Sequence, residues 1–316
     1  MSAVVEARGL VKTYGEITAV DHVDLTVEAG DVYGYLGPNG AGKTTSLRML
    51  LGLIRPTAGS ARLFGRDPMI DGVRALDGVA GFVEAPRFYP YLSGRKNLEL
   101  VAALDGGDAR TLIDGALDTV DLAARAKDRV GGYSHGMRQR LGIAGALIRQ
   151  PRLLLLDEPA TGLDPAGMRD MRALIRNLAA SGITVLLSSH LMNEVEELCN
   201  RVAIIRAGSI VYEGRLDELR ASAAGSYTLR TSDDVIAAHI CAIHPGISDL
   251  VVTPDGIRVR ADEATIEALS IELGRSEVAL RALIPDHASL EERFFALTED
   301  PVAPVAPATP ELERVA

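Results

Sequence analysis

The chain has 316 residues, of which 47% are hydrophobic and 24% charged, so it can build a globular core of useful size. Its formal net charge of -10 argues against a protein that binds nucleic acid through an overall basic face. The two cysteines, Cys199 and Cys241, are too few for a disulfide framework or a spaced metal motif, and we expect both to be small buried hydrophobic residues.

The apolar stretches of the chain are short. Residues 1–8 lack the apolar core of a signal peptide. No stretch reaches the ~18 apolar residues that a bilayer-spanning helix needs. The longest runs, such as residues 153–156, have the length of buried strands. We therefore expect any role at a membrane to depend on a partner protein.

Residues 1 to about 220 alternate short apolar runs with helical patterns, which predicts an α/β domain. The clearest segments are a strand at 32–36 that runs into a glycine-rich turn, a helix at 44–53, and two further buried strands at 153–156 and 183–187. Helical periodicity dominates residues 97–150, so we expect an inserted helical subdomain at about 86–150.

Residues 226–299 predict a second, small α+β accessory domain, joined to the first by a linker at 221–226. Its expected strands lie at 227–229, 250–252 and 257–259, and its expected helices at 235–243 and 263–273. Gly256 suits the turn between the last two strands because glycine readily takes a positive φ.

The tail, residues 300–316, is rich in proline and alanine. Proline recurs at every third position from 301 to 310, which favours polyproline II and prevents helix formation. We expect this tail to be disordered, with a ligand for a proline-binding module as the alternative.

Residues 37–44 read Gly-Pro-Asn-Gly-Ala-Gly-Lys-Thr and match the phosphate-binding pattern G-x-x-x-x-G-K-[ST]. Glycines allow backbone N–H groups to converge on phosphate oxygens, and the following helix directs its positive N-terminal end at the same anion. We expect Lys43 to reach the β- and γ-phosphates of ATP and the Thr44 hydroxyl to bind Mg²⁺. The expected nucleotide-binding residues of this segment are Gly37, Asn39, Gly40, Ala41, Gly42, Lys43, Thr44 and Thr45.

Two carboxylates follow the apolar run at 153–156. Asp157 would lie at the carboxyl edge of its strand, where open α/β sheets bind ligands, and could hold Mg²⁺ through water. Glu158 could then polarise the water that attacks ATP. Such a pair would ordinarily be a solvated strand end, but together with the phosphate-binding segment it predicts a catalytic centre.

With these motifs the sequence resembles the ATPases of ABC transporters over nearly all of residues 4–220. Tyr14 occupies the position where that family stacks an aromatic ring on adenine. Residues 133–140 resemble the family signature, which implies that Ser134 and Gly136 bind the γ-phosphate of an ATP held by the opposite subunit. Asp164, in Gly162-Leu163-Asp164, falls in the loop that resembles the family's dimer-crossing loop, and His190 matches the switch histidine that contacts γ-phosphate.

The chain departs from the family pattern in two places. The usual switch-loop glutamine is replaced by Glu84, which could still face Mg²⁺, bind it more strongly, or alter coupling to the membrane partner. The second glycine and the final glutamine of the usual Leu-Ser-Gly-Gly-Gln signature are His135 and Met137. The loss of the glutamine removes a polar contact. We expect this loss to affect the rate of ATP hydrolysis more than ATP binding.

Residues 84–90 and 133–140 together resemble bacterial drug-efflux and bacitracin-resistance-type exporter ATPases. Those proteins also carry a small C-terminal domain that often ends in a Ser-Leu-Glu-x-x-Phe-like stretch, and residues 289–295 are similar. The resemblance implies a multidrug or antibiotic exporter.

The resemblance also implies how such a subunit works and which partners it has. Two copies would close head-to-tail around two ATP molecules with Mg²⁺. We expect a homodimer, with a heterodimer as the alternative. Closure would pull on a separate polytopic permease through the Glu84 loop and the nearby helical surface. The chain would then lie at the cytoplasmic face of the cell membrane, with no nucleic acid as partner.

Other functions remain open at this stage. An ATPase subunit of an ABC importer would carry the same motifs. A soluble ABC ATPase switch acting on ribosomes or DNA usually has two ATPase units or long coiled coils, whereas this chain has one set of motifs and no sustained heptads. A P-loop kinase or GTPase would not need the ordered motifs from Ser134 to His190.

Overall fold

The computed structural model describes residues 3–105, 108–223, 225–286, 294 and 298. A six-stranded sheet forms the centre of the larger unit, in the order β5-β6-β7-β3-β8-β9. All neighbouring strands in it are parallel except β8 and β9, which pair antiparallel. The strands are β5 (Val79–Phe82), β6 (Leu153–Asp157), β7 (Thr184–Ser189), β3 (Val32–Leu36), β8 (Arg201–Arg206) and β9 (Ser209–Arg215).

The parallel strands are apolar because both faces of the sheet are covered. In β6, Leu154 and Leu156 belong to one hydrophobic cluster, and Leu153 and Leu155 belong to the other. This alternation is the consequence of the two-residue period of a strand. The predicted α/β fold and the predicted strands at 32–36, 153–156 and 183–187 are thereby confirmed, with Thr184–Ser189 as the bounds of the last.

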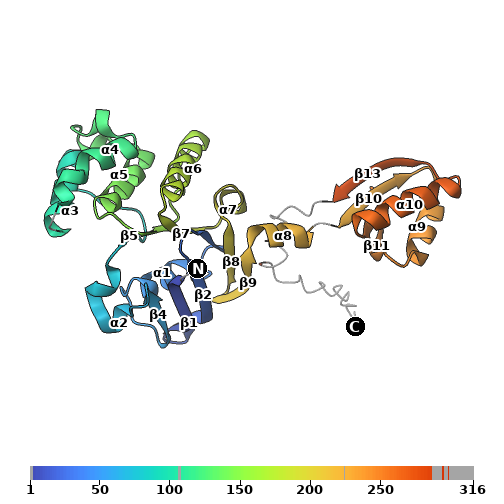
Figure 1. Cartoon of the computed structure of the whole chain (residues 1–316), viewed down its shortest axis with the longest axis horizontal. Helices are drawn as coiled ribbons and strands as arrows, with labels where there is room; N and C mark the ends of the chain where they lie inside the picture. The colour runs from blue at the N-terminus through green and yellow to red at the C-terminus, as the bar shows by residue number, and fades with distance from the viewer. Residues whose placement is uncertain (1–2, 106–107, 224, 287–293, 295–297, 299–316) are drawn as a thin grey trace, which may run out of the picture.

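A second sheet of the larger unit is antiparallel, in the order β2-β1-β4 (Figure 1). Its strands are β1 (Ala3–Tyr14), β2 (Ile17–Glu28) and β4 (Ala58–Leu63). Helix α1 (Lys43–Leu50) packs against this sheet through Leu47, Met49 and Leu50, which share its hydrophobic cluster. The expected helix at 44–53 was too long, because Gly52 takes a left-handed φ of 69° that ends the helix.

The helical part of the chain at 86–150 lies at the β5 side of the central sheet (Figure 1), and its buried side chains share a hydrophobic cluster with Leu154 and Leu156 of β6. It contains α3 (Gly94–Asp105), α4 (Ile113–Thr119) and α5 (His135–Leu147), with short 3₁₀ segments at Ala109–Leu112, Ala123–Arg125 and Val130–Gly132. The remaining helices of the larger unit are α2 (Pro68–Asp71), α6 (Pro165–Ala180), α7 (Met192–Leu198) and α8 (Leu216–Ala223), with a 3₁₀ segment at Gly72–Leu76.

Residues 226–286 build their own sheet and core. The elements are β10 (Ser226–Thr231), α9 (Asp234–Ile243), β11 (Ser248–Thr253), β12 (Gly256–Arg260), α10 (Glu263–Arg275) and β13 (Leu280–Asp286). The order βαββαβ, with an antiparallel sheet arranged β11-β12-β10-β13, is the ferredoxin-like arrangement. Strand β13 was not expected from the sequence. It is an edge strand, the position in a sheet that tolerates a proline such as Pro285.

The connection between the two units differs from the prediction. The expected linker at 221–226 was too long, because α8 continues to Ala223 and β10 begins at Ser226. Asp217 and Glu218 in the first turn favour α8 by complementing its helix dipole. Farther along, Phe294 is 6% exposed and belongs to the same core cluster as Leu216 and Leu219. The chain therefore returns to the core of the larger unit after β13.

The proline-rich tail at 300–316 lies outside the described residues, and of residues 289–295 the structure describes Phe294 alone. Cys199 and Cys241 are both buried and free, as expected, and burial raises the pKa of each thiol. Among the helices that the structure describes, none combines the length and the apolar composition needed to cross a bilayer.

Candidate active site

The phosphate-binding segment is a tight loop between β3 and α1. Gly42 takes a φ of 106°, and a Cβ there would lie 2.4 Å from the Ala19 carbonyl oxygen. A Cβ at Gly37 would lie equally close, 2.4 Å, to the Ile205 carbonyl oxygen. Any other residue at these two positions would collide with backbone, so the fold itself requires glycine at both.

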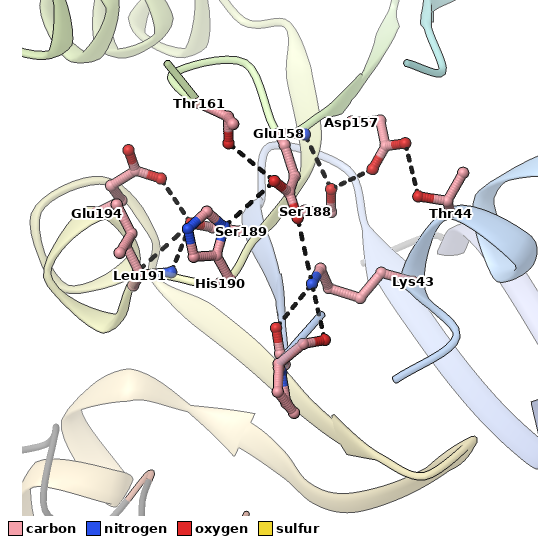
Figure 2. Close-up of polar contacts among 12 residues, drawn as sticks. Lys43, Thr44, Asp157, Glu158, Thr161, Ser188, Ser189, His190, Leu191 and Glu194 are labelled. Atoms are coloured by element: carbon pink, nitrogen blue, oxygen red, sulfur yellow. Dashed lines mark hydrogen bonds and ion pairs between the residues drawn. The ribbon is translucent and has the colours of Figure 1, made fainter. Parts of the chain in front are cut away.

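Lys43, the first residue of α1, points into the centre of the site (Figure 2). Its side chain is only 5% exposed, and its Nζ donates to the carbonyl oxygens of Gly37, at 2.7 Å, and Pro38, at 3.2 Å. Its Nζ also lies 3.2 Å from Oε1 of Glu158. The ammonium group is therefore held at the mouth of the loop, beside the carboxylate that follows β6.

Thr44 and Asp157 meet at the carboxyl end of β6. The Thr44 hydroxyl donates to Oδ2 of Asp157 at 2.9 Å, and the Ser188 hydroxyl donates to Oδ1 at 2.6 Å (Figure 2). The pairing of β6 with β7 sets Asp157 directly opposite Ser188. A hydroxyl and a carboxylate at this spacing are the hard oxygen ligands that Mg²⁺ prefers, so these residues fit the expected metal.

Glu158 is held in an unfavourable backbone conformation. Its φ is 47°, which is uncommon for a residue with a Cβ and concentrates at functional sites. Its N–H donates to the Ser188 hydroxyl at 2.9 Å. Its Oε2 accepts from the Thr161 hydroxyl at 2.8 Å and lies 3.2 Å from Nδ1 of His190. Because an ionised carboxylate only accepts hydrogen bonds, Nδ1 carries the hydrogen in this contact.

The surroundings of Glu158 keep it ionised. Partial burial acts to raise the pKa of this carboxyl group, but the Thr161 hydrogen bond and the Lys43 ammonium outweigh it, with a smaller effect from His190. The net result is a pKa below the usual range of glutamate. Glu158 is therefore in its unprotonated form, the form that a general base needs.

Two cavities meet at these residues. The first, of about 200 Å³, is lined by Ala19, Asn39, Gly40, Gly42, Lys43, Thr44, Thr45 and Glu158. The second, of about 330 Å³, is lined by Thr44, Glu84, Ala85, His135, Gln139, Asp157, Glu158 and Thr161. They share Thr44 and Glu158. The structure thus brings together most of the residues that the sequence predicted for phosphate, metal and base.

Two predicted residues are placed differently from the rest. The backbone N–H of Glu84 donates to Oδ2 of Asp157 at 3.3 Å, but its carboxylate forms an ion pair with Arg48 of α1. Tyr14, at the end of β1, is 48% exposed, and its ring lies 5.0 Å from Nζ of Lys12. Tyr14 is absent from the described residues that line the phosphate-loop cavity.

The signature residues form a separate site. Ser134 caps α5 by accepting from the N–H of Met137 at 3.2 Å, and Asp164 caps α6 by accepting from the N–H of Gly167 at 2.8 Å. Both helix ends line one cavity of about 390 Å³, together with Gly136. Two helix N-termini at one cavity favour an anion. Lys43 and Glu158 are not among the described residues that line it.

Some residues of the site were missed by sequence reasoning. Ser188, Thr161 and Gln139 were not singled out, although each touches or lines the site. The position of Ser188, near the end of β7 and two residues before His190, was a usable signal. Thr161 follows Glu158 by three residues, a spacing at which a turn returns a side chain toward its start.

Comparison with known proteins gives consistent matches. The family model described as ABC transporter matches residues 20–161. The bacitracin transport ATP-binding protein BcrA of Bacillus licheniformis is 42% identical, over 81% of this chain and 84% of its own length. The daunorubicin/doxorubicin resistance ATP-binding protein DrrA of Streptomyces peucetius is 38% identical, over 94% of this chain and 93% of its own.

Solved structures agree with this result. One is an ATP-binding cassette solved as a dimer in a post-hydrolysis state, bound to ADP and phosphate. It is 26% identical and has a TM-score of 0.60, and the match covers 67% of this chain and 98% of the cassette chain. A second structure is described as the ATP-binding subunit of an ABC transporter. It is 26% identical with a TM-score of 0.62, and the match covers 69% of this chain and 92% of that subunit.

Proposed function

Because the chain belongs to the ABC transporter family, as one of its ATP-hydrolysing subunits, we propose that it powers the export of drugs or antibiotics through a separate polytopic permease. The support is that the bacitracin and daunorubicin relatives are similar to it beyond the ATPase unit. The match to the Streptomyces protein extends over 94% of the chain and so includes most of the C-terminal unit. An importer subunit is the alternative function.

The observation that carries the hydrolytic role is the contact of Lys43 with Glu158 beside Thr44 and Asp157. In our proposal, Lys43 and the loop N–H groups bind the ATP phosphates. Thr44 and Asp157 would hold Mg²⁺, which would supply positive charge to offset that of the phosphates. The ionised Glu158 orients the attacking water and accepts its proton, and His190, held through Nδ1, presents Nε2 to the γ-phosphate side. Glu84 would approach this metal site after leaving Arg48.

We further propose that two copies form a homodimer that completes each site. Ser134, Gly136 and Asp164 line a cavity of their own, about 390 Å³ in volume. In a head-to-tail pair this cavity would bind the γ-phosphate of the ATP held by the other subunit. Tyr14, exposed at the end of β1, would stack on the adenine. The dimeric state of the related cassette bound to ADP and phosphate supports this arrangement.

We assign residues 226–299 to an accessory domain and residues 300–316 to a tail. The same proposal places the chain at the cytoplasmic face of the cell membrane. The permease would bind this chain at the Glu84 loop and the neighbouring helical subdomain.

Transport itself tests the exporter function. Inside-out vesicles from the host that produces this chain should accumulate a fluorescent anthracycline when MgATP is added, and vesicles carrying Lys43→Ala should not. In parallel, tagged Glu158→Gln protein solubilised with MgATP should retain a polytopic membrane protein in stoichiometric yield. Uptake that depends on an extracellular binding protein would favour an importer. Recovery of only ribosomal or DNA-associated proteins would overturn the transporter function.

A further inference from the structure

His135, the first residue of α5, faces two sites at once. It lines the signature cavity together with its neighbours Ser134 and Gly136. It also lines the second cavity of the active site, together with Asp157 and Glu158. This side chain is therefore shared by the half-site that would bind the other subunit's ATP and the half-site that would hydrolyse the chain's own ATP.

The imidazole makes a direct contact with the loop that follows Glu158. Nε2 of His135 lies 3.0 Å from the carbonyl oxygen of Thr161. A carbonyl oxygen can only accept, so Nε2 carries the hydrogen and donates. The ring also lies against Gly162, where a Cβ would be 3.5 Å from Nε2. His135 thus fixes the carbonyl of Thr161 from the side of the signature helix.

Thr161 is in turn bonded twice to Glu158. Its N–H donates to the Glu158 carbonyl oxygen at 3.2 Å, and its hydroxyl donates to Oε2 of the Glu158 carboxylate at 2.8 Å. The hydroxyl bond is the first of the interactions that lower the pKa of Glu158 against the opposing effect of burial. A displacement of Thr161 would therefore change both the position and the proton affinity of this carboxylate.

Gln139, one turn after His135 on α5, supports the same contact. Its side chain is 3% exposed, and within the described part of the chain its Oε1 is buried without a hydrogen-bond partner. Its Nε2 lies 3.5 Å from Nε2 of His135, which would set two donors face to face. With the amide rotated by a half-turn, Oε1 would lie 3.5 Å from Nε2 of His135 and could share the hydrogen that this nitrogen donates to Thr161. Gln139 then orients the imidazole toward Thr161.

We propose that His135 is a positioning residue for Glu158: it holds Thr161, which holds the carboxylate. The inference rests on the proposed function, since it assumes that Glu158 is the base and that Ser134 and Gly136 bind the other subunit's ATP. The consequence is that ATP bound at the signature of one chain is sensed by the base of that same chain. The two ATP sites of a dimer are thereby linked within each subunit.

The test is a mutant cycle in the full-length chain, with ATP turnover and ATP affinity measured separately. His135→Leu removes the donor and should lower kcat about three- to tenfold, the rate equivalent of one lost hydrogen bond, while ATP affinity stays within about twofold. His135→Gln carries its amide nitrogen close to the position of Nε2 and should restore most of the rate. In a Thr161→Val background, His135→Leu should have no further effect on kcat.

Three results would overturn the inference: wild-type kcat in His135→Leu, equal loss in His135→Leu and His135→Gln, or an undiminished loss in the Thr161→Val background. Glu158→Gln, measured alongside, separates this inference from the proposed function. If Glu158→Gln turns over ATP at the wild-type rate, the assignment of the base is wrong. If Glu158→Gln is inactive and His135→Leu is normal, the positioning role alone is wrong.

Discussion

Nζ of Lys43 lies 3.2 Å from Oε1 of Glu158, which joins the phosphate loop to the carboxyl end of β6. The lysine side chain is 5% exposed and the glutamate 25%, so neither charge is fully solvated. Charges removed from water are costly unless they are paired, and the Lys43 ammonium is among the causes that hold the pKa of Glu158 below its usual range. The pair brings the group that would bind phosphate and the group that would activate water within one hydrogen bond of each other.

Replacement of Glu158 by glutamine should separate binding from hydrolysis. The amide keeps the size and polarity of the side chain but cannot accept the proton of water, so we expect turnover to fall by at least about 100-fold. ATP affinity should be retained. Phosphate release and titration with a fluorescent ATP analogue measure the two quantities. Turnover near the wild-type rate would remove Glu158 from the role of base.

Replacement of Lys43 by alanine should act on binding instead. The loss of a charge-assisted contact with phosphate should weaken ATP affinity at least about tenfold. The same titration measures it, with Lys96→Ala as control, because Lys96 is 59% exposed and pairs with Glu99 on the surface of α3. Unchanged affinity in Lys43→Ala, or an equal loss in both variants, would contradict the assignment of the phosphate loop.

The phosphate loop and the carboxylates of β6 were predictable because their signals are local. Glycines at fixed spacing, and an apolar run that ends in Asp157 and Glu158, specify both structure and chemistry within a few residues. The contact of Ser188 with Asp157 was not predictable in this way, because it depends on the register of β6 and β7 across 31 positions of sequence. Likewise, nothing local to Glu84 indicates that its carboxylate pairs with Arg48.

The same distinction holds at the level of the fold. The helices and strands of the C-terminal unit were visible as patterns, but its βαββαβ arrangement depends on which strands pair. Strand β13 in particular is defined by its pairing with β10, since Leu283 lies opposite Leu229. Its sequence is interrupted by Arg281 and ends near Pro285, so alternation alone did not identify it.

Replacement of Thr161 by valine should weaken the pH dependence of the free energy of unfolding in the acid range. The pKa of Glu158 is lowered in the folded protein, so its stabilising contribution is present above the unfolded pKa of about 4.3 and is lost as pH falls through the lower folded value. Without the Thr161 hydroxyl, the folded pKa should move upward and this contribution should shrink. We expect a stability deficit of about 1 kcal/mol at pH 7.

Urea unfolding of Thr161→Val and wild type at a series of pH values checks this sign. The deficit should diminish as pH falls below about 4.3, because the carboxyl group becomes protonated in both proteins. Thr111→Val is a matched control, since the Thr111 hydroxyl donates to the carbonyl oxygen of Asp108, a group that does not titrate. A Thr161→Val deficit that is constant with pH would mean that the hydroxyl does not act on Glu158.

The Arg48–Glu84 ion pair should compete with Mg²⁺ for the Glu84 carboxylate. Both side chains are substantially exposed, 36% and 59%, so loss of the pair by Arg48→Met should change stability by less than about 1 kcal/mol. The released carboxylate should lower the Mg²⁺ concentration for half-maximal hydrolysis by up to about fivefold, the equivalent of about 1 kcal/mol. Titration of ATP hydrolysis with MgCl₂ measures this, and in Glu84→Gln the Arg48→Met change should have no effect. An identical Mg²⁺ dependence in Arg48→Met and wild type would contradict the competition.

Phe294 should anchor the chain that follows the C-terminal unit to the core of the ATPase unit. It is 6% exposed within the hydrophobic cluster that contains Leu216 and Leu219, both 3% exposed, on α8. Removal of a buried phenylalanine side chain leaves a cavity, so Phe294→Ala should cost about 3 kcal/mol. The loss should appear first as faster amide hydrogen exchange in α8, which packs against this side of the core.

Hydrogen-exchange mass spectrometry of the full-length chain measures this locally, so the unfolding of the two units need not be separated. Val252→Ala is the control, because Val252 is 63% exposed on β11 and its truncation should change stability by less than about 0.5 kcal/mol. If exchange in α8 is unchanged by Phe294→Ala, the aromatic ring does not hold the chain to the core. If exchange rises in α8 but not in β10 to β13, the contact of Phe294 stabilises the ATPase unit, and the ferredoxin-like unit is stable through its own sheet and core.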